Sequence, residues 1–535
     1  MRRKNVFLGV FLLASLGLLL SFTPGQSQTD GRLTPEMQQI AKDILQSPLA
    51  GYLSSTGLNA LEHVAGRLSV PQRLRSAPAL QSRMPTTALP LAPAVPGAEV
   101  MVNNPALDPL ERFDVSTQSE TAVAGFGGNI VVAYNNSATL PTSFMGYSFS
   151  VDGGTAWTDL RGLPGPTGGF NFGDPGLVGD RAGNFYASQI ASDPIRPPGF
   201  SFTVGISKST DGGSTFSIPV SPPAAGVSPF SFQDKAFIAV DTSGGPFGGN
   251  VYVTWTSFGG PFTKLPIFFS RSNDGGATFS TPLQISTSTE SDQGSEPVVG
   301  PNGEIYVAWE RFVDSANPLA PPAIVVAKSI DGGLSFSSPV VVAPLTDIGF
   351  GAGTMLGNFR VNSFPRIDVS PTTGTVYIVF ASNPQTGDAG DIFFTRSTDG
   401  GVTWAVRTRL NDDATLNDQF FPDVAVNGNG VVEVFWYDKR NDPANLRIDL
   451  FKTRSEDDGV SFTPNAQVNA VSFPPAVGYD PFVVPTFMGD YIDIKAITTS
   501  TGRGSAFLMA WGDNRRAIVT LGGTRNDQDV FFTRD

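Results

Sequence analysis

The sequence predicts an all-β fold built from repeats of about 60 residues, and three observations support this. A motif of the form Ser-x-Asp-x-Gly-x-[Thr/Ser/Ala]-[Trp/Phe] occurs six times, at spacings of 57 to 68 residues. An apolar segment that ends in polar residues occurs seven times between residues 129 and 516. Gly, Pro and Phe are abundant (59, 43 and 41 residues), which suits many short strands joined by turns. A motif at near-constant period indicates a repeat architecture.

Each copy of the motif has the residues of a tight turn between two strands. Gly supplies positive φ at little steric cost, and the Asp side chain can accept hydrogen bonds from backbone N–H groups of the turn. The Trp or Phe that follows can pack beneath the turn. We therefore interpret the central aspartates as structural residues. They are Asp152, Asp211, Asp274, Asp331, Asp399 and Asp457.

These six copies resemble the Asp-box, or bacterial neuraminidase repeat, whose best-known members are the sialidases. In that family the box joins the third and fourth strands of a β-propeller blade. The last repeat of this chain stops at Asp535, where a box would begin, and the segment Ala98 to Asn104 resembles the strands that follow other boxes. The sequence therefore predicts a seven-bladed β-propeller over residues 98–535, closed by an N-terminal strand and preceded by a short helical segment. Sialidases have six blades, so the blade count departs from the family.

Three segments precede the predicted propeller. Arg2, Arg3 and Lys4, followed by the apolar run 6–22, predict a signal peptide over residues 1–28 and thus a secreted or cell-envelope protein with no membrane attachment after its removal; a retained anchor is the alternative. Helix-start residues and apolar periodicity predict a helical segment over residues 29–75, as a pro-region, a cap or a partner-binding piece. Abundant Pro and Ala over residues 76–97 indicate a linker.

The composition restricts the chemistry of the chain. Cysteine is absent, which excludes disulfides, thiolate nucleophiles and Cys-ligated metals. The single histidine, His63, lies outside the repeats, so the repeats hold neither a Ser-His-Asp triad nor a His-ligated zinc site. The net charge of −13 argues against nucleic acid as a partner. We expect no resident cofactor or metal, with calcium as the candidate cation; the oligomeric state is left open.

Acidic residues recur where the first strand of each repeat begins, at the equivalent position in five of the seven. Because this strand lines the channel of a propeller, the acids are expected at the channel mouth, on the face away from the boxes. They either cap backbone N–H groups and pair with arginines, or form a polar pocket for a glycan. The predicted ligand-binding residues are Arg311, Arg366, Arg440, Arg515, Asp513, Glu120, Asp174, Asp234, Glu296 and Asp490.

The stretch from Trp436 to Gly459 is similar to the sialidase pattern of a strand, an acidic-x-Arg element, a loop Asp, a strand and a box. The resemblance implies Asp442 as acid/base and Asp438 with Arg440 as pocket residues. The Tyr/Phe-Arg-Ile-Pro strand of sialidases has no counterpart; in 364–367 Pro and Arg are exchanged. The candidate catalytic residues are Asp442, Asp438, Tyr437, Tyr491 and Glu310.

We therefore expect a secreted, sialidase-like propeller that binds or hydrolyses glycans at the channel mouth; if it is an enzyme, it is a glycoside hydrolase with two carboxyl groups across the bond. The alternative is a non-enzymatic interaction scaffold of the cell envelope. Polysaccharide lyase action by Tyr with Arg or Lys is a third option. Carboxyl oxygens ~5 to 9 Å apart around an open pocket favour hydrolysis, and acids buried in Arg pairs favour the scaffold.

Overall fold

The computed structural model describes residues 35–47, 50–51, 53–66, 98–107, 117–140, 143–193, 201–225, 231–259, 264–287, 289–312, 321–349, 354–475, 480, 482–520 and 523–535. The predicted signal peptide and the predicted linker lie outside these residues. Within them, no helix is both long enough and apolar enough to cross a membrane.

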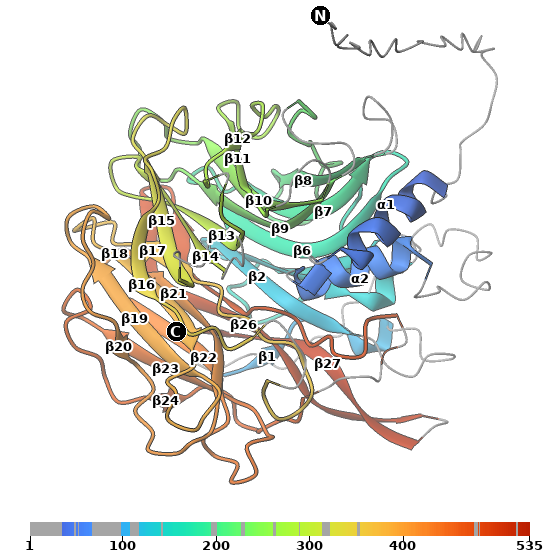
Figure 1. Ribbon diagram of the computed structural model, residues 1–535, viewed down its shortest axis with the longest axis vertical. Helices are drawn as coiled ribbons and strands as arrows, with labels where there is room; N and C mark the ends of the chain where they lie inside the picture. The colour runs from blue at the N-terminus through green and yellow to red at the C-terminus, as the bar shows by residue number, and fades with distance from the viewer. Residues whose placement is uncertain are drawn as a thin grey trace, which may run out of the picture.

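Antiparallel sheets, most of them four-stranded, make up most of the described chain (Figure 1). Four sheets have four strands each, with bounds β9 (Ser231–Val240), β10 (Val251–Gly259), β11 (Ile267–Ser272), β12 (Leu283–Gln284); β13 (Asp292–Val299), β14 (Ile305–Arg311), β15 (Ala323–Ser329), β16 (Val340–Pro344); β17 (Arg366–Val369), β18 (Val376–Ser382), β19 (Asp391–Ser397), β20 (Thr408–Arg409); and β21 (Gln419–Val426), β22 (Val432–Asp438), β23 (Asp449–Ser455), β24 (Ala466–Gln467). A three-stranded sheet contains β6 (Phe170–Gly179), β7 (Phe185–Asp193) and β8 (Ser201–Ser209), and Val220 bridges Ile206 at the outer edge of β8.

The remaining sheet joins the two ends of the repeat region. In order, its strands are β1 (Val100–Met101), β27 (Gly523–Arg534), β26 (Gly502–Thr520), β25 (Asp493–Thr499), β2 (Gln118–Phe126), β3 (Asn129–Asn136), β4 (Met145–Ser150) and β5 (Thr158–Gly162). β2 meets β25 through a single residue pair, Phe126 with Thr498, so the sheet consists of two four-stranded halves. β1 pairs with the last strand, Val100 opposite Phe532. The mostly β chain of repeated antiparallel sheets has the architecture of a β-propeller, as the sequence predicts.

The six motif copies all fold into the same hydrogen-bonded turn. In the third copy, the Ser272 hydroxyl donates to Asp274 Oδ1 at 2.6 Å and accepts from Gly276 N at 2.8 Å. Asp274 also accepts from the backbone and the hydroxyl of Thr278, at 2.9 and 2.5 Å. These hydrogen bonds to the charged form lower the pKa of Asp274 to about 2. The box aspartate therefore fixes the turn between the third and fourth strands.

A basic side chain just before several boxes reaches the turn of the next sheet. Lys208 Nζ donates to Gly275 O at 2.9 Å, and Lys328 Nζ donates to Gly400 O at 3.1 Å. Arg271 contacts the next turn in the same way. These contacts hold neighbouring sheets together at the box end.

The first strand of five sheets carries a bulge, at which the register with the second strand shifts. Each bulge contains at least one residue with positive φ; these include Glu120 (52°), Asp174 (64°), Lys235 (62°), Gly294 (68°) and Phe421 (49°). Positive φ in a residue other than Gly costs on the order of 1–3 kcal/mol and is concentrated at functional sites. Three of these five residues, Glu120, Asp174 and Lys235, are charged, so the bulges place charged side chains near the start of their first strands.

The bulges also correct one expectation. The acids do not occupy equivalent positions: Glu120 and Asp174 are themselves the bulge residues, whereas Asp234 precedes the bulge residue Lys235 and Glu296 follows Gly294 by two. Because all five strands bulge at the same place, the acids occupy different positions relative to the bulge, and no single position of the first strand is acidic throughout.

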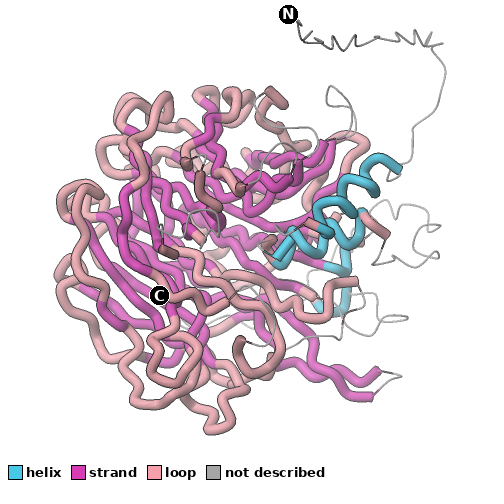
Figure 2. Tube along the Cα trace, in the orientation of Figure 1, coloured by secondary structure: helices cyan, strands magenta, loops and turns pink. Residues whose placement is uncertain are grey.

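Two helices, α1 (Pro35–Gln46) and α2 (Ser55–Val64), lie beside β2 and β6 (Figures 1 and 2). Short 3-10 turns cover Pro105–Leu107 and Ser137–Thr139. The helices bury an apolar face against phenylalanines of several sheets. The buried helical residues are Ile40, Ala41, Ile44, Ala60, Leu61 and Val64, and the aromatic residues beneath them are Phe172, Phe202, Phe232, Phe258, Phe312 and Phe364. Burial of this face fixes the N-terminus of α2 over the acidic bulges.

Candidate functional site

Side chains from β2, β6 and β9 and from the segment just before β25 converge beneath the N-terminus of α2, and we call this group the acidic cluster. Its members are Glu120, Asp174, Asp234, Lys235, Asp490 and Tyr491, all of them buried. Three consecutive residues of the helical segment bind it. The Ser54 hydroxyl donates to Asp234 Oδ1 and the Ser55 hydroxyl to Asp490 Oδ1, both at 2.6 Å.

The backbone and the third hydroxyl complete these contacts. Ser54 N donates to Asp234 Oδ2 at 2.7 Å and Ser55 N to Asp490 Oδ2 at 2.5 Å. The Thr56 hydroxyl donates to Glu120 Oε2 at 2.6 Å. The free N–H groups and the dipole of a helix N-terminus favour negative charge. Asp234, Asp490 and Glu120 are therefore held by hydroxyl and amide donors at the N-terminus of α2.

Lys235 and Tyr491 form the remaining side of the acidic cluster. Lys235 Nζ lies 3.6 Å from the centre of the Tyr491 ring and 3.7 Å from Asp174 Oδ1. The Tyr491 hydroxyl donates to Pro175 O at 2.8 Å and lies 3.2 Å from Asp174 Oδ1. Lys235 Nζ has no hydrogen-bond acceptor among the described residues, so its charge is balanced by Asp174 and the aromatic ring.

Burial controls the protonation of the acids. It raises the pKa of Glu120 well above its usual range, and the negative charge of Asp174 adds to the effect. Burial also raises the pKa of Asp234 to about 7, with Asp174 contributing in the same direction. For Asp174 burial raises the pKa while Lys235 opposes the rise. Burial therefore favours the neutral form of Glu120. Among the described residues, Glu120 Oε1 and Asp174 Oδ2 have no hydrogen-bond donor apart from one another.

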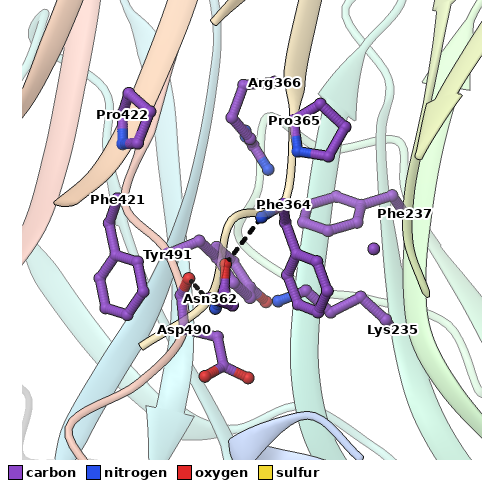
Figure 3. Close-up of a pocket in the computed structure, with 11 residues that line it drawn as sticks. Lys235, Phe237, Asn362, Phe364, Pro365, Arg366, Phe421, Pro422, Asp490 and Tyr491 are labelled. Atoms are coloured by element: carbon purple, nitrogen blue, oxygen red, sulfur yellow. Dashed lines mark hydrogen bonds between the residues drawn. The ribbon is translucent and has the colours of Figure 1, made fainter. Parts of the chain in front are cut away.

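A small cavity lies next to the acidic cluster (Figure 3). Lys235, Phe237, Arg366 and Tyr491 line it, and Asn362 spans one side by donating to Asp490 O at 3.1 Å. Its free volume of about 10 Å³ is enough for roughly one water molecule. A cavity of this volume has no room for a sugar ring.

Arg366 and Glu296 belong to a second group, which we call the ion-pair cluster. Arg366 donates from Nε and Nη2 to the two oxygens of Asp423, each at 2.9 Å, and from Nη2 to Asp493 Oδ1 at 2.8 Å. Lys495 Nζ lies 3.0 Å from Asp493 Oδ1 and 3.5 Å from Glu296 Oε1. These ion pairs compensate the buried charges. Nε and Nη2 of Arg366 are engaged in them, and among the described residues Nη1 has no hydrogen-bond partner, so Nη1 is the nitrogen that could contact a ligand.

Two predicted Asp–Arg pairs are repeats of one structural unit. Arg440 Nε donates to Asp438 Oδ2 at 2.9 Å, and Arg515 Nε donates to Asp513 Oδ2 at 2.9 Å. Each guanidinium also stacks over a phenylalanine, at 4.2 and 4.3 Å from the ring centre. The predicted residue Arg311 pairs with Glu290 at 3.2 Å. None of these residues lines the cavity.

Only Tyr491 of the five candidate catalytic residues lies in the acidic cluster. The Tyr437 hydroxyl donates to Gly512 O at 2.6 Å inside a phenylalanine-rich core. Asp442 accepts from three backbone N–H groups of its own loop, which lower its pKa. Glu310 is fully buried, and burial raises its pKa well above the usual range. Of these five residues, Tyr491 alone lines the cavity, and the structure does not gather them into one site.

Sequence reasoning missed three features of the site. Lys235 directly follows the predicted residue Asp234, but no sequence motif marked Lys235 itself. Asn362 lies in a loop with no motif. The run Ser54-Ser55-Thr56 is an N-cap signature, because Ser54 accepts from Gly57 N at 2.8 Å, and it could have marked the start of α2. Among the described residues, no group of acids and histidine is arranged to hold a metal ion.

Comparison with known proteins gives distant structural resemblances only. No protein-family model matches the chain, and no curated protein matches it. A Hadza microbial sialidase is 14% identical, covering 75% of each chain with a TM-score of 0.40. An ulvan lyase of family PL25, bound to a GlcA-Rha3S saccharide, is 12% identical over 75% of this chain and 92% of its own, with a TM-score of 0.46. A GH93 α-L-arabinofuranosidase of Fusarium graminearum, in complex with arabinobiose, is 11% identical over 64% and 92%, with a TM-score of 0.40. The resemblance is distant and concerns the β-propeller fold.

Proposed function

We propose that this protein is an exported, seven-bladed β-propeller that binds a glycan at the acidic cluster. One observation carries the proposal: the hydroxyls of Ser54, Ser55 and Thr56 donate to three different carboxyl groups, each at 2.6 Å. The hydroxyls of a sugar are donors of the same kind, and a carboxylate is a strong acceptor for them. The helical segment thus shows which donors the cluster accepts.

The apolar patch beneath α1 and α2 supplies the other half of such a site. It is rich in phenylalanine, and Phe364 connects it to the acidic cluster, with Lys235 Nζ 5.3 Å from its ring centre. Small-molecule sites combine an apolar, aromatic lining with a few polar groups that fix orientation. Displacement of the helices would expose both parts together.

If the protein hydrolyses its glycan, Glu120 is the better proton donor. A general acid needs a raised pKa, which burial gives to Glu120, whereas hydrogen bonds lower the pKa of Asp442. Asp174 and Asp490 are the carboxyl groups available as partner. This assignment replaces the loop residue Asp442 with a residue of the first strand.

The blade count and the export are further parts of the proposal. Six sheets, one with two four-stranded halves, together with the pairing of β1 with β27, support seven blades closed by the N-terminal strand. The basic N-terminus and the apolar run 6–22 support export to the cell envelope or the medium. Sequencing the N-terminus of the mature protein tests the export: a chain that still begins at residue 1 contradicts it.

A second candidate function is a non-enzymatic interaction scaffold, in which α1 and α2 are a permanent cap. The specific observation in its favour is that the cavity has room for about one water molecule while the helices are seated. On this view the acids only anchor the cap.

A binding screen decides between the two. The full chain and its Gly57→Ala variant, which disturbs the seat of α2, are screened against labelled sialosides and plant and algal polysaccharides. We expect binding by at least one panel member that is lost in Glu120→Gln and in Asp490→Asn. If neither protein binds or cleaves any panel member, the glycan proposal fails and the scaffold remains.

A further inference from the structure

The helical segment holds the acidic cluster by a polar contact and an apolar one. The polar contact consists of the three hydroxyls and the two backbone N–H groups of Ser54–Thr56. The apolar contact buries Ile44, Leu61 and Val64 on the phenylalanine patch. The same surfaces that suit a glycan are therefore occupied by a segment of the chain itself.

Two further hydrogen bonds seat the segment. Arg360 Nη2 donates to Leu53 O at 2.6 Å, immediately before the N-cap residue Ser54. At the other end of α2, His63 Nε2 lies 2.6 Å from Phe482 O, so it donates to that carbonyl. The segment is thus bound at both ends of α2.

The fit at Gly57 shows how closely the first turn of α2 approaches the acids. A Cβ atom on Gly57 would lie 2.5 Å from Asp234 Oδ1. Asp234 has little freedom to move away, because Ser54 and Gln293 Nε2 both donate to it. Only a glycine fits at this position of the seated helix.

We propose that residues 35–66 are an inhibitory segment, which imitates the hydroxyl groups of the ligand and must leave before a ligand binds. The proposal rests on the proposed function of the acidic cluster. Ligand and helix compete for the same carboxyl groups, so the apparent affinity equals the intrinsic affinity multiplied by the open fraction of the protein. Any change that favours the open form tightens ligand binding without altering a ligand contact.

The test uses the full chain and two substitutions in the segment. Gly57→Ala places a Cβ against Asp234. Because alanine is a better helix former than glycine, any loosening of α2 in this variant is caused by the lost fit against Asp234 and not by a lower helix propensity. Gly51→Ala is the matched control, because nothing lies within 4 Å of a Cβ at that position. If Gly57→Ala fails to fold, Ser54→Ala combined with Ser55→Ala removes two hydroxyls without adding an atom.

Two measurements are made on each protein. Amide hydrogen exchange reports whether residues 54–64 are protected. Binding is measured with the glycan panel and with a fluorescent peptide of residues 50–66. We expect faster exchange of α2 in Gly57→Ala but not in Gly51→Ala, at least ten-fold tighter binding of a panel glycan by Gly57→Ala, and binding of the peptide by Gly57→Ala but not by the wild type.

The outcomes separate this inference from the proposed function. Unchanged exchange of α2 in Gly57→Ala overturns the inference. So does a glycan that binds the wild type and Gly57→Ala equally well despite a loosened α2, and that result leaves the glycan function standing. If no glycan binds either protein, the function fails, and the peptide decides: binding to Gly57→Ala alone supports the inhibitory segment, while binding to both or to neither overturns it.

Discussion

Arg366 and Asp423, from the first strands of neighbouring sheets, form a bidentate ion pair with both nitrogen–oxygen distances at 2.9 Å. Both side chains are buried, and Arg366 also contacts Asp493 and Glu296. In the acidic cluster Lys235 is the cation, and Glu120, Asp234 and Asp490 accept hydrogen bonds from Thr56, Ser54 and Ser55. One group of acids is therefore held by buried cations and the other mainly by donors at the N-terminus of α2, so their mutants should be distinguishable.

Arg366→Leu should destabilise the protein by about 3–5 kcal/mol, because it leaves buried carboxyl groups without their counter-charge. Urea unfolding measures the effect. Arg409→Leu is the control, since the Arg409 side chain is 41% exposed in its pair with Asp391 and should cost no more than about 1 kcal/mol. Equal losses in the two variants would contradict the structural role of Arg366.

Stability should fall as the pH rises from 5 to 7.5. Burial raises the pKa of Asp234 and of Asp493 to about 7, above the value of 3.8 expected in the unfolded chain. The folded protein therefore binds more protons than the unfolded one, and this stabilisation is complete below pH ~3.8 and lost as the pH passes through 7.

Urea midpoints across this pH range measure the change, with Asp234→Asn as the comparison. The variant should show a smaller decrease, because one titrating group is removed. Hydrogen bonds lower the pKa of box aspartates such as Asp274, so their contribution to stability increases with pH. This increase takes place below pH ~4, outside the pH range of the measurement. A stability that increases from pH 5 to 7.5 would exclude this account.

Asp274→Ala should destabilise the protein by about 1 kcal/mol, because the turn loses its acceptor for Thr278 N and for the Ser272 hydroxyl. Asp274→Asn keeps Oδ1 as an acceptor and should recover part of the loss. Thermal unfolding of the two variants measures the difference. An alanine variant as stable as the wild type would mean that the glycine residues alone fix the turn.

Tyr491→Phe and Tyr437→Phe should differ in ligand binding. The Tyr491 hydroxyl lies against Asp174 at the cavity, so its loss should weaken glycan binding several-fold in the Gly57→Ala background. Among the described residues, the Tyr437 hydroxyl donates to the Gly512 carbonyl, away from the cavity, so its loss should cost about 1 kcal/mol of stability and leave binding unchanged. Binding isotherms of both variants, compared at matched folded fractions, check the expectation; weaker binding in Tyr437→Phe would reverse the assignment.

The repeat fold could be predicted because its signals are local. Ser, Asp and Gly of each box lie within eight residues of one another, and they form the same turn in all six copies. The acids of the first strands could also be recognised in the sequence, but their positions along the strands could not. A bulge such as those at Lys235 and Gly294 has no residue pattern that distinguishes it from a regular strand.

The sequence by itself therefore determined the sheets, their turns and the supply of buried acids. Only the tertiary structure decided what neutralises them. Ser54 meets Asp234 across 180 residues, and Ser55 meets Asp490 across 435. No local pattern encodes such contacts, because they depend on where folding brings the first helices relative to the last sheet. The polar surface that the sequence suggests for a ligand is consequently held by the chain's own N-terminal segment.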